Sequence, residues 1–205
     1  GSFWVQFIRG LKRRGLSGVQ LAITDDHEGL KGAVARVLAC PWQRCTVHFT
    51  RDMLAHCRRD QRGLVGAALR EIFQAENGEA ANERVTSVLE RLAPVAPKVC
   101  QLLQDAEEDL IAFYAFPREH WTKIRSTNPL ERVNKEIGRR ADVVGIFPND
   151  ASVIRLAGAL LLEQNDEWLV QRRYLSAESM ALVLAPADDA GRQVVEAEEV
   201  ARLAA

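Results

Sequence analysis

A short apolar run, "VQLAI" at residues 19–23, lies between two segments whose apolar residues recur at helical spacing. The first segment covers residues 3–11 and the second covers residues 30–38. The run has the length and composition of a buried strand, so these residues predict a helix–strand–helix unit. Asp25 and Asp26 follow the run directly, at the carboxyl end of the strand, where open α/β sheets place their ligand sites.

Downstream of this unit the sequence predicts one more strand and then helices. Residues 43–49, "QRCTVHF", alternate between apolar and polar and predict a second strand. Helical periodicity follows over residues 64–75, 79–92 and 98–115, without a strand-like segment between them. A helix opens near Asn128, and another carries Val153 and Leu160. We therefore expect an α/β fold that is mostly α overall, with an all-helical insertion.

Composition excludes several classes of protein. The 205 residues are 47% hydrophobic and 27% charged, as in ordinary soluble globular proteins. No apolar stretch is long enough to span a bilayer, and "GSFWVQFIRG" lacks the features of a signal peptide. The four cysteines show no spacing typical of a disulfide framework. These features predict a reduced, cytoplasmic protein without a membrane partner.

The charge is unevenly distributed, although the net charge is only −1. Residues 118–140 carry seven Lys or Arg against three acids, whereas residues 178–205 carry six acids against two arginines. The basic segment is either a solvated helix face or a surface that contacts nucleic-acid phosphates. Under the second interpretation the expected DNA-binding residues are Lys123, Arg125, Asn128, Lys135, Arg139 and Arg140.

Two interpretations of Asp25 and Asp26 remain open at this point. They can form a solvated strand end, or an N-cap for the helix that carries Leu30, because Asp is a preferred cap. Alternatively, a carboxylate held at a strand end can bind Mg²⁺, which prefers a few hard oxygen ligands. A carboxylate of this kind suits metal-assisted phosphoryl chemistry.

Glu131 also has a structural and a functional interpretation. With Asn128 as N-cap and Pro129 at the first helical position, "NPLE" resembles a capping box, with Glu131 at the third position. Its helix is expected to bury Leu130, Val133 and Ile137. Glu131 and Glu136 then lie on opposite flanks of that face, so only one of them can face a given site.

Cys45 and His48 form a C-x-x-H pattern, which occurs in zinc sites. If both lie on the strand predicted for residues 43–49, they point to opposite faces, since side chains alternate along a strand. A buried cysteine and a hydrogen-bonded histidine are therefore favoured over a structural zinc site.

The order of several motifs identifies a resemblance that single features leave open. "FWVQFIRGLKRRGLSGVQLAITDDHEGLKGAV" is followed by "WQRCTVHFTRDML" and then by "FYAFPREHWTKIRSTNPLERVNKEIGRRADVVGIFPNDASVIRL". Together they closely resemble the transposases of bacterial Mutator-type insertion sequences, over about residues 3–175. This resemblance implies a DDE transposase with an RNase H-like catalytic core and a helical insertion before the last acidic helix.

The resemblance also implies roles for individual residues. The catalytic aspartate of the family matches Asp25, and the catalytic glutamate matches Glu131, with two Mg²⁺ ions expected between the family's carboxylates. Cys45 and His48 match a family motif of unclear role. The implied partners are DNA, both transposon ends and target, and further copies of the chain assembled on that DNA. The implied location is the cytoplasm, in association with the nucleoid.

The sequence departs from the family pattern in two ways. The first of three catalytic carboxylates is expected on a strand that precedes Phe3, and the 205 residues start at the helix of Phe3. Gly138 stands where relatives usually carry a basic residue. We therefore expect the chain alone to be inactive in transposition. The alternative is a non-catalytic transposase remnant that binds DNA or an intact transposase.

These expectations divide the chain into four segments. Residues 1–50 form the first part of an RNase H-like core, residues 51–124 the helical insertion, residues 125–175 the closing helices with the catalytic glutamate, and residues 176–205 an acidic, Ala-rich tail.

Overall fold

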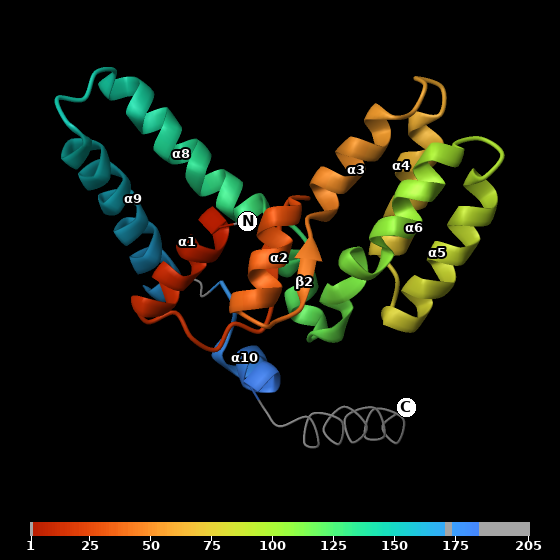
Figure 1. The fold of residues 1–205 in the computed structure, drawn as a ribbon, viewed down its shortest axis with the longest axis horizontal. Helices are drawn as coiled ribbons and strands as arrows, with labels where there is room; N and C mark the ends of the chain where they lie inside the picture. Colours follow the sequence, from red (N-terminus) through yellow and green to blue (C-terminus); the bar gives the residue numbers. More distant parts are fainter. Residues whose placement is uncertain (1, 171–173, 185–205) are drawn as a thin grey trace. The chain divides into compact units, whose positions relative to one another are not determined.

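The computed structural model describes residues 2–170 and 174–184 (Figure 1). They are mostly helical, with one small parallel sheet. The chain divides into two compact units, the first comprising residues 1–115 and 121–146 and the second residues 116–120 and 147–205. The expectation of a mostly α protein is confirmed, whereas the divisions at residues 50, 124 and 175 stay predictions.

The first unit begins with a helix–strand–helix–strand segment. Its elements are α1 (Ser2–Arg13), β1 (Ala22–Thr24), α2 (Glu28–Val37) and β2 (Trp42–Arg44). The two strands pair in parallel, with Ala22 opposite Trp42 and Thr24 opposite Arg44. Ile8 of α1, Ala33 and Val34 of α2 and Trp42 of β2 form a small buried core. The parallel pairing places Asp25 and Cys45 side by side, because each follows the carboxyl end of its strand.

The two predicted strands are both shorter than expected. The run at residues 19–23 forms a strand only from Ala22 to Thr24, because its partner β2 has just three residues. The strand predicted for residues 43–49 is wrong beyond Arg44, since Thr46 begins a helix. Phe49 and Met53 are both buried at helical spacing in that helix. Burial of these side chains at helical spacing outweighs the short alternation of apolar and polar residues, so the segment forms a helix rather than a strand.

The helical insertion is a bundle with its own core. Its elements are α3 (Thr46–Ala55), α4 (Arg62–Phe73), α5 (Gly78–Leu92), α6 (Pro97–Ile111), the 3₁₀ turn η1 (Ala112–Ala115) and the short α7 (Trp121–Ile124). Figure 1 shows α4, α5 and α6 packed side by side. Their apolar stripes bury one continuous cluster that includes Phe49, Leu69, Val88 and Leu103. The three helices predicted for residues 64–115 are confirmed.

Two helices lack the buried face that their sequences predict. No residue of α8 (Asn128–Val144) is buried, and Leu130 is 60% exposed. The expectation that Leu130, Val133 and Ile137 form a core face is therefore wrong, since Val133 and Ile137 are only half-buried. In the second unit, α9 (Asp150–Val170) also buries no residue. That unit further contains η2 (Arg118–His120) and α10 (Ala177–Leu184); the rest of the predicted tail, residues 185–205, lies outside the described residues.

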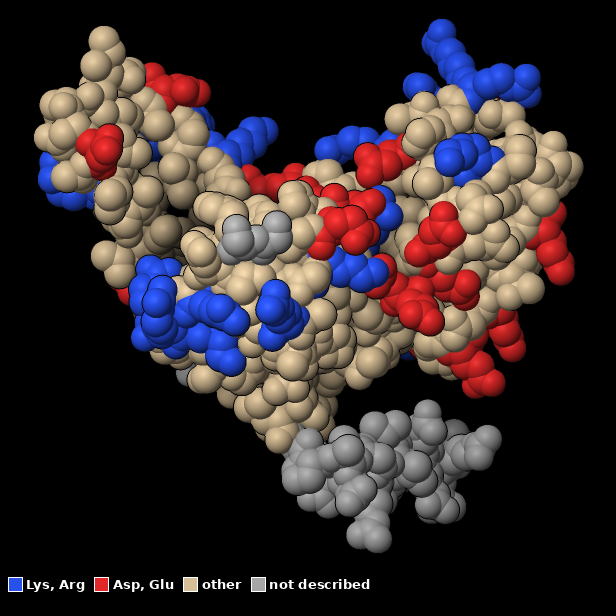
Figure 2. All heavy atoms as spheres, viewed as in Figure 1, with Lys and Arg blue, Asp and Glu red and all other residues tan. Residues whose placement is uncertain are grey.

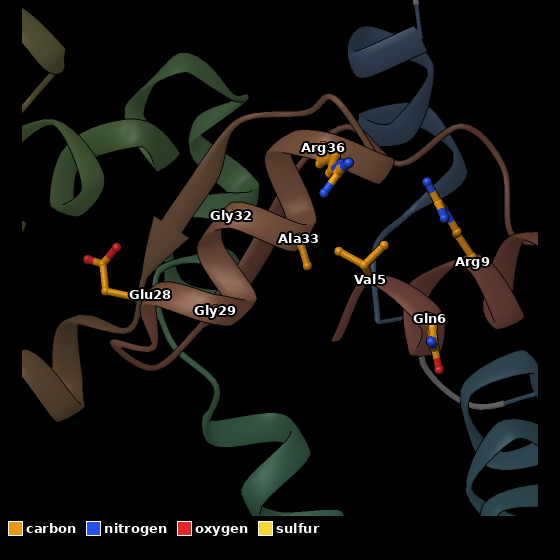
Figure 3. Close-up of a pocket in the computed structure, with 8 residues that line it drawn as sticks. All are labelled: Val5, Gln6, Arg9, Glu28, Gly29, Gly32, Ala33 and Arg36. Atoms are coloured by element: carbon orange, nitrogen blue, oxygen red, sulfur yellow. The ribbon is translucent and has the colours of Figure 1, made fainter. Parts of the chain in front are cut away.

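A hollow lies between α1 and α2 (Figure 3). Figure 3 shows Val5 of α1 and Ala33 of α2 pointing toward one another, with Arg9 and Arg36 at the rim. The small residues Gly29 and Gly32 form part of its wall. Glu28 is the one acidic residue of its lining, so the hollow contains no cluster of carboxylates.

Gln43 joins the sheet to the insertion. Its side chain is fully buried. Its amide nitrogen donates to the carbonyls of Leu110 (2.9 Å) and Arg44 (2.7 Å). Its amide oxygen accepts from the backbone N–H of Phe113 (2.8 Å). One amide therefore satisfies backbone groups at the junction of α6 and η1, nearly seventy positions away along the chain.

We expect Gln43→Leu to lower the free energy of unfolding by about 2–6 kcal/mol, because a buried donor and a buried acceptor lose their partner at about 1–3 kcal/mol each. Chemical denaturation of both proteins would measure this loss. Gln101→Leu is the matched control, since Gln101 is exposed on α6, and its effect should stay within about 0.5 kcal/mol. Equal effects at the two positions would contradict the role assigned to Gln43.

Candidate active site

Asp25, Cys45 and His48 meet at the carboxyl ends of β1 and β2. Asp25 follows β1, Cys45 is the N-cap of α3, and His48 lies in the first turn of that helix. The N–H of Cys45 donates to the carbonyl of Thr24 (2.8 Å), which holds the start of α3 beside the end of β1. His48 Nδ1 lies 2.7 Å from Asp25 Oδ1 and 3.3 Å from Cys45 Sγ.

The contact between Cys45 and His48 corrects the sequence-based argument against it. That argument placed the two residues on a strand, on opposite faces. Because Cys45 and His48 are instead the N-cap and the third residue of a helix, their side chains lie on the same side. Each of Asp25, Cys45 and His48 offers one ligand atom, and these atoms lie within 4.8 Å of one another.

The start of α8 is fixed against the start of α3. The backbone N–H and the hydroxyl of Thr46 both lie 3.0 Å from the Arg125 carbonyl, to which they donate. The backbone N–H and the hydroxyl of Thr127 both lie 3.4 Å from Cys45 Sγ. The Arg125 guanidinium donates to the carbonyl of Phe73 at the end of α4 (2.9 Å). The contacts of Thr46 and Thr127 join residues about eighty positions apart in the chain.

Glu131 reaches the same site from the first turn of α8. Its Oε1 accepts a hydrogen bond from the Thr127 hydroxyl (3.0 Å) and lies 3.6 Å from His48 Nδ1. Since Asp25 Oδ1 lies 2.7 Å from the same nitrogen, the two carboxylate oxygens are at most the sum of these distances apart, about 6 Å. The Asp25 and Glu131 side chains are 58% and 44% exposed, so ions in solution can reach both.

The capping predictions for both helices need correction. The N-cap of α8 is Thr127 rather than Asn128, so Glu131 is the fourth helical residue and does not complete a capping box. The N-cap of α2 is His27, whose Nδ1 accepts from the N–H of Leu30 (3.2 Å). Neither Asp25 nor Asp26 caps this helix, and Glu131 contacts the cap residue Thr127 without forming a capping box.

The two adjacent aspartates have different partners. Asp26 forms an ion pair with the Arg44 guanidinium (3.0 Å), which also lies 3.6 Å from Asp52. The same guanidinium stacks over the Phe49 ring. Asp26 therefore belongs to a structural ion pair at the sheet edge, whereas Asp25 faces His48.

The site perturbs both its thiol and its imidazole. Burial raises the pKa of the Cys45 thiol, but hydrogen bonds from Thr127 and His48 outweigh burial, so the pKa lies below its usual value. Burial lowers the pKa of His48, but the hydrogen bond with Cys45 and the charge of Asp25 outweigh it, so the pKa is raised. Both shifts favour the charged forms, a thiolate beside an imidazolium.

The raised pKa of His48 predicts how stability depends on pH. A raised folded-state pKa adds stability that is fully present below the unfolded-state value of 6.5 and is lost as pH rises through the folded-state pKa. His48→Gln should therefore destabilise the chain most below pH 6.5. Urea denaturation of both proteins across a pH series would measure the difference. A difference that grows with rising pH would contradict the assignment.

The basic residues predicted to bind DNA differ in the contacts that they make within the chain. Glu136 pairs with Arg139 (2.7 Å) and Arg140 (2.8 Å), and these two arginines hold the pKa of Glu136 at about 2. Lys135 forms no ion pair with any described residue, and it lines a shallow pocket with Asn128, Glu131 and Arg132. Lys123 lies half-buried in α7. Arg125 contacts Phe73, so it also has a structural role.

The contacts that Thr127 and Arg44 make at this site were not predicted from the sequence. Thr127 contacts Cys45 and Glu131, and the pair "ST" before "NP" was the available signal. Arg44, which follows the buried Gln43, anchors Asp26. Figure 2 shows a further basic surface over the carboxyl ends of α1 and α2. Its exposed residues are Arg9, Lys12, Arg13 and Arg36.

Comparison with known proteins decides the family. The sequence model described as "Transposase, Mutator family" matches residues 1–171. The chain belongs to the Mutator family of transposases. The resemblance noted in the sequence is thereby confirmed, and this Mutator-family chain is a transposase sequence of the insertion-sequence type.

Three curated relatives illustrate the similarity. The chain is 44% identical to the transposase for insertion sequence element IS1081 of Mycobacterium tuberculosis, over 87% of this chain and 43% of the relative. It is 36% identical to the transposase for ISRM5 of Rhizobium meliloti, over 87% of this chain and 45% of the relative. It is 34% identical to the transposase for IS256 in transposon Tn4001 of Staphylococcus aureus, over 84% and 45%.

The chain thus spans less than half the length of these curated relatives. No helix of the described residues is long and apolar enough to cross a membrane. All four cysteines are free thiols.

Proposed function

We propose that this chain supplies two metal-binding carboxylates, Asp25 and Glu131, to a Mg²⁺-dependent site that cleaves and transfers DNA strands. The observation that carries the proposal is the convergence of both carboxylates on His48 Nδ1, at 2.7 Å and 3.6 Å, from elements more than one hundred residues apart in sequence. Membership of a transposase family supports the same reaction class.

The two carboxylates fit Mg²⁺ by their chemistry. They present hard oxygen donors, and both are open to solvent, so water can complete the octahedral shell that Mg²⁺ requires. Bound there, Mg²⁺ would polarise the scissile phosphate and activate the attacking water or 3′-hydroxyl. The chain's own residues position the donors: β1 holds Asp25, and the contacts of Thr127 hold Glu131.

The remaining parts of the proposal concern the longer protein. A DDE site needs three carboxylates, whereas the cluster of described residues contains two. We place the third in the part of the longer relatives that this chain does not span, within the same RNase H-like core. We further propose that the complete transposase works as a homo-oligomer on transposon ends and target DNA, in the cytoplasm at the nucleoid.

DNA contact is assigned to the basic face of α8. Lys135 and Asn128 line the same shallow pocket as Glu131, so a DNA backbone held there would lie beside the carboxylates. Free N–H groups at the start of α8 favour phosphate as well. Arg139 and Arg140 can contribute fully only when their ion pairs with Glu136 are exchanged for phosphate contacts.

Metal binding tests the carboxylate assignment. Calorimetric titration of the 205-residue chain with MgCl₂ should show weak binding, and Asp25→Asn and Glu131→Gln should each weaken it at least about tenfold, because each removes a charged ligand. Asp26→Asn is the matched control, since Asp26 pairs with Arg44, and it should leave Mg²⁺ affinity unchanged.

Two outcomes would count against a catalytic role. Equal Mg²⁺ affinity in the parent chain and in Asp25→Asn would contradict the site. Salt-sensitive DNA binding by a chain that binds no Mg²⁺ would instead indicate a non-catalytic DNA-binding remnant. Mg²⁺-dependent nicking of DNA that both carboxylate variants abolish would support the catalytic role directly.

A second prediction concerns DNA affinity. Glu136→Gln should tighten binding to a DNA duplex, because it removes a negative charge and frees Arg139 and Arg140. If one more phosphate contact forms, the slope of log affinity against log salt should steepen by about 0.9. Glu83→Gln on α5 carries the same change in charge at an exposed position of the insertion. An equal gain in the two variants would show that only net charge matters.

A further inference from the structure

We propose that Asp25, Cys45 and His48 form a binding site for a borderline-soft divalent cation of the Zn²⁺ type, which differs from the Mg²⁺ site by its thiolate and imidazole ligands. The three ligand atoms lie within 4.8 Å of one another. The proposal stands on this geometry and does not depend on DNA cleavage.

The donor set determines which metals the site prefers. A thiolate and an imidazole nitrogen suit zinc, whereas Mg²⁺ takes oxygen ligands. Zinc binds sulfur at about 2.3 Å and nitrogen at about 2.0 Å. The separation of 3.3 Å between Cys45 Sγ and His48 Nδ1 approaches the spacing of two ligands on one tetrahedral zinc ion.

The atom at the centre of the cluster is His48 Nδ1. It lies 2.7 Å from Asp25 Oδ1 and 3.3 Å from Cys45 Sγ, so a proton on this nitrogen can be donated to one of these two atoms. A bound cation would take the place of that proton, because both the imidazole and the thiol must be deprotonated to act as ligands. Small outward movements of Asp25, an exposed side chain, would open the necessary space.

The ligands of the proposed site differ in exposure. Cys45 is fully buried, so a cation reaches its sulfur from the side of the exposed carboxylates of Asp25 and Glu131. Three protein ligands leave a fourth tetrahedral position, as in zinc sites that hold a water or an exchangeable ligand. Glu131 Oε1, 3.6 Å from His48 Nδ1, is positioned to take that place.

The proposed site shares Asp25 with the Mg²⁺ site. A cation held by Cys45 and His48 would therefore withdraw Asp25, and Glu131 if it fills the fourth position, from Mg²⁺. Zn²⁺ and Mg²⁺ should consequently exclude one another, although they rely on different additional ligands. This difference separates the two proposals experimentally.

Direct titration tests the proposal. The reduced 205-residue chain is titrated with Zn²⁺ by calorimetry and with Co²⁺ by absorption, where a thiolate ligand gives an intense charge-transfer band. Loss of an outer-shell partner costs about 10–100-fold in metal affinity, so loss of a ligand in Cys45→Ser or His48→Gln should lower Zn²⁺ affinity at least about 100-fold. Cys40→Ser and His56→Gln are matched controls and should bind Zn²⁺ like the parent.

Comparison of the two metals separates this proposal from the proposed function. Cys45→Ser should lower Zn²⁺ affinity far more than Mg²⁺ affinity, because the thiolate is a ligand of Zn²⁺ alone and acts on Glu131 only through Thr127, whereas Asp25→Asn should weaken binding of both metals. Circular dichroism shows whether each variant is folded, and His48→Gln provides a second variant if Cys45→Ser unfolds. Equal Zn²⁺ affinity in the parent and in both ligand variants would overturn the proposal, as would a Co²⁺ spectrum without the thiolate band. Zn²⁺ binding without any Mg²⁺ binding would uphold this site and count against the proposed function alone.

Discussion

The candidate site depends on the hydrogen bonds that Thr46 donates to the Arg125 carbonyl. No residue of α8 is buried, so packing of the helix body does not determine where its first turn lies. The junction does, through Thr46 and through the contacts of Thr127 with Cys45 Sγ. Glu131 follows one turn later and therefore inherits its position. A side chain on an unburied helix, such as Glu131, is placed by the helix end rather than by the core.

For Thr46 and Arg125 to meet, the helical insertion between them must bring the chain back to the start of α3. Between Thr46 and Arg125 the polypeptide makes a long excursion, and closing so long a loop costs entropy. The bundle offsets this cost with its own apolar cluster and with fixed anchors at its base. Gln43 binds the turn after α6, and Arg125 binds the end of α4. The insertion thus acts as a spacer with its own core, whose two ends meet at the site.

Helices that bury a continuous stripe could be predicted from the sequence, because a buried stripe leaves a regular spacing of apolar residues. The helices from Arg62 to Ile111 and the unit around α2 are of this kind. The boundary between β2 and α3 could not be predicted from the sequence, since Cys45, Val47 and Phe49 alternate with polar residues as in a strand. Thr127 and Asn128 are both good caps, so the sequence alone places the N-cap of α8 one residue too late. Asp25 and Glu131 could be named as candidate site residues from the sequence, but their meeting at His48 depends on contacts between residues about eighty positions apart.

Under the two metal-site proposals, the shared partner of the two carboxylates would give the site its selectivity between metals. The lone pair of His48 Nδ1 can bind a proton or a metal ion, but not both at once. With a proton there, the imidazole neutralises part of the charge of Asp25 and holds its oxygen near Glu131. With a soft cation there, the thiolate of Cys45 joins the coordination and Asp25 is withdrawn from hard-metal binding. A protonated His48 is thus compatible with oxygen-ligated Mg²⁺, and a metallated His48 is not. The C-x-x-H pattern brings a thiol and an imidazole into contact with the two carboxylates, so under the two proposals the state of one nitrogen would determine which kind of metal the carboxylates bind.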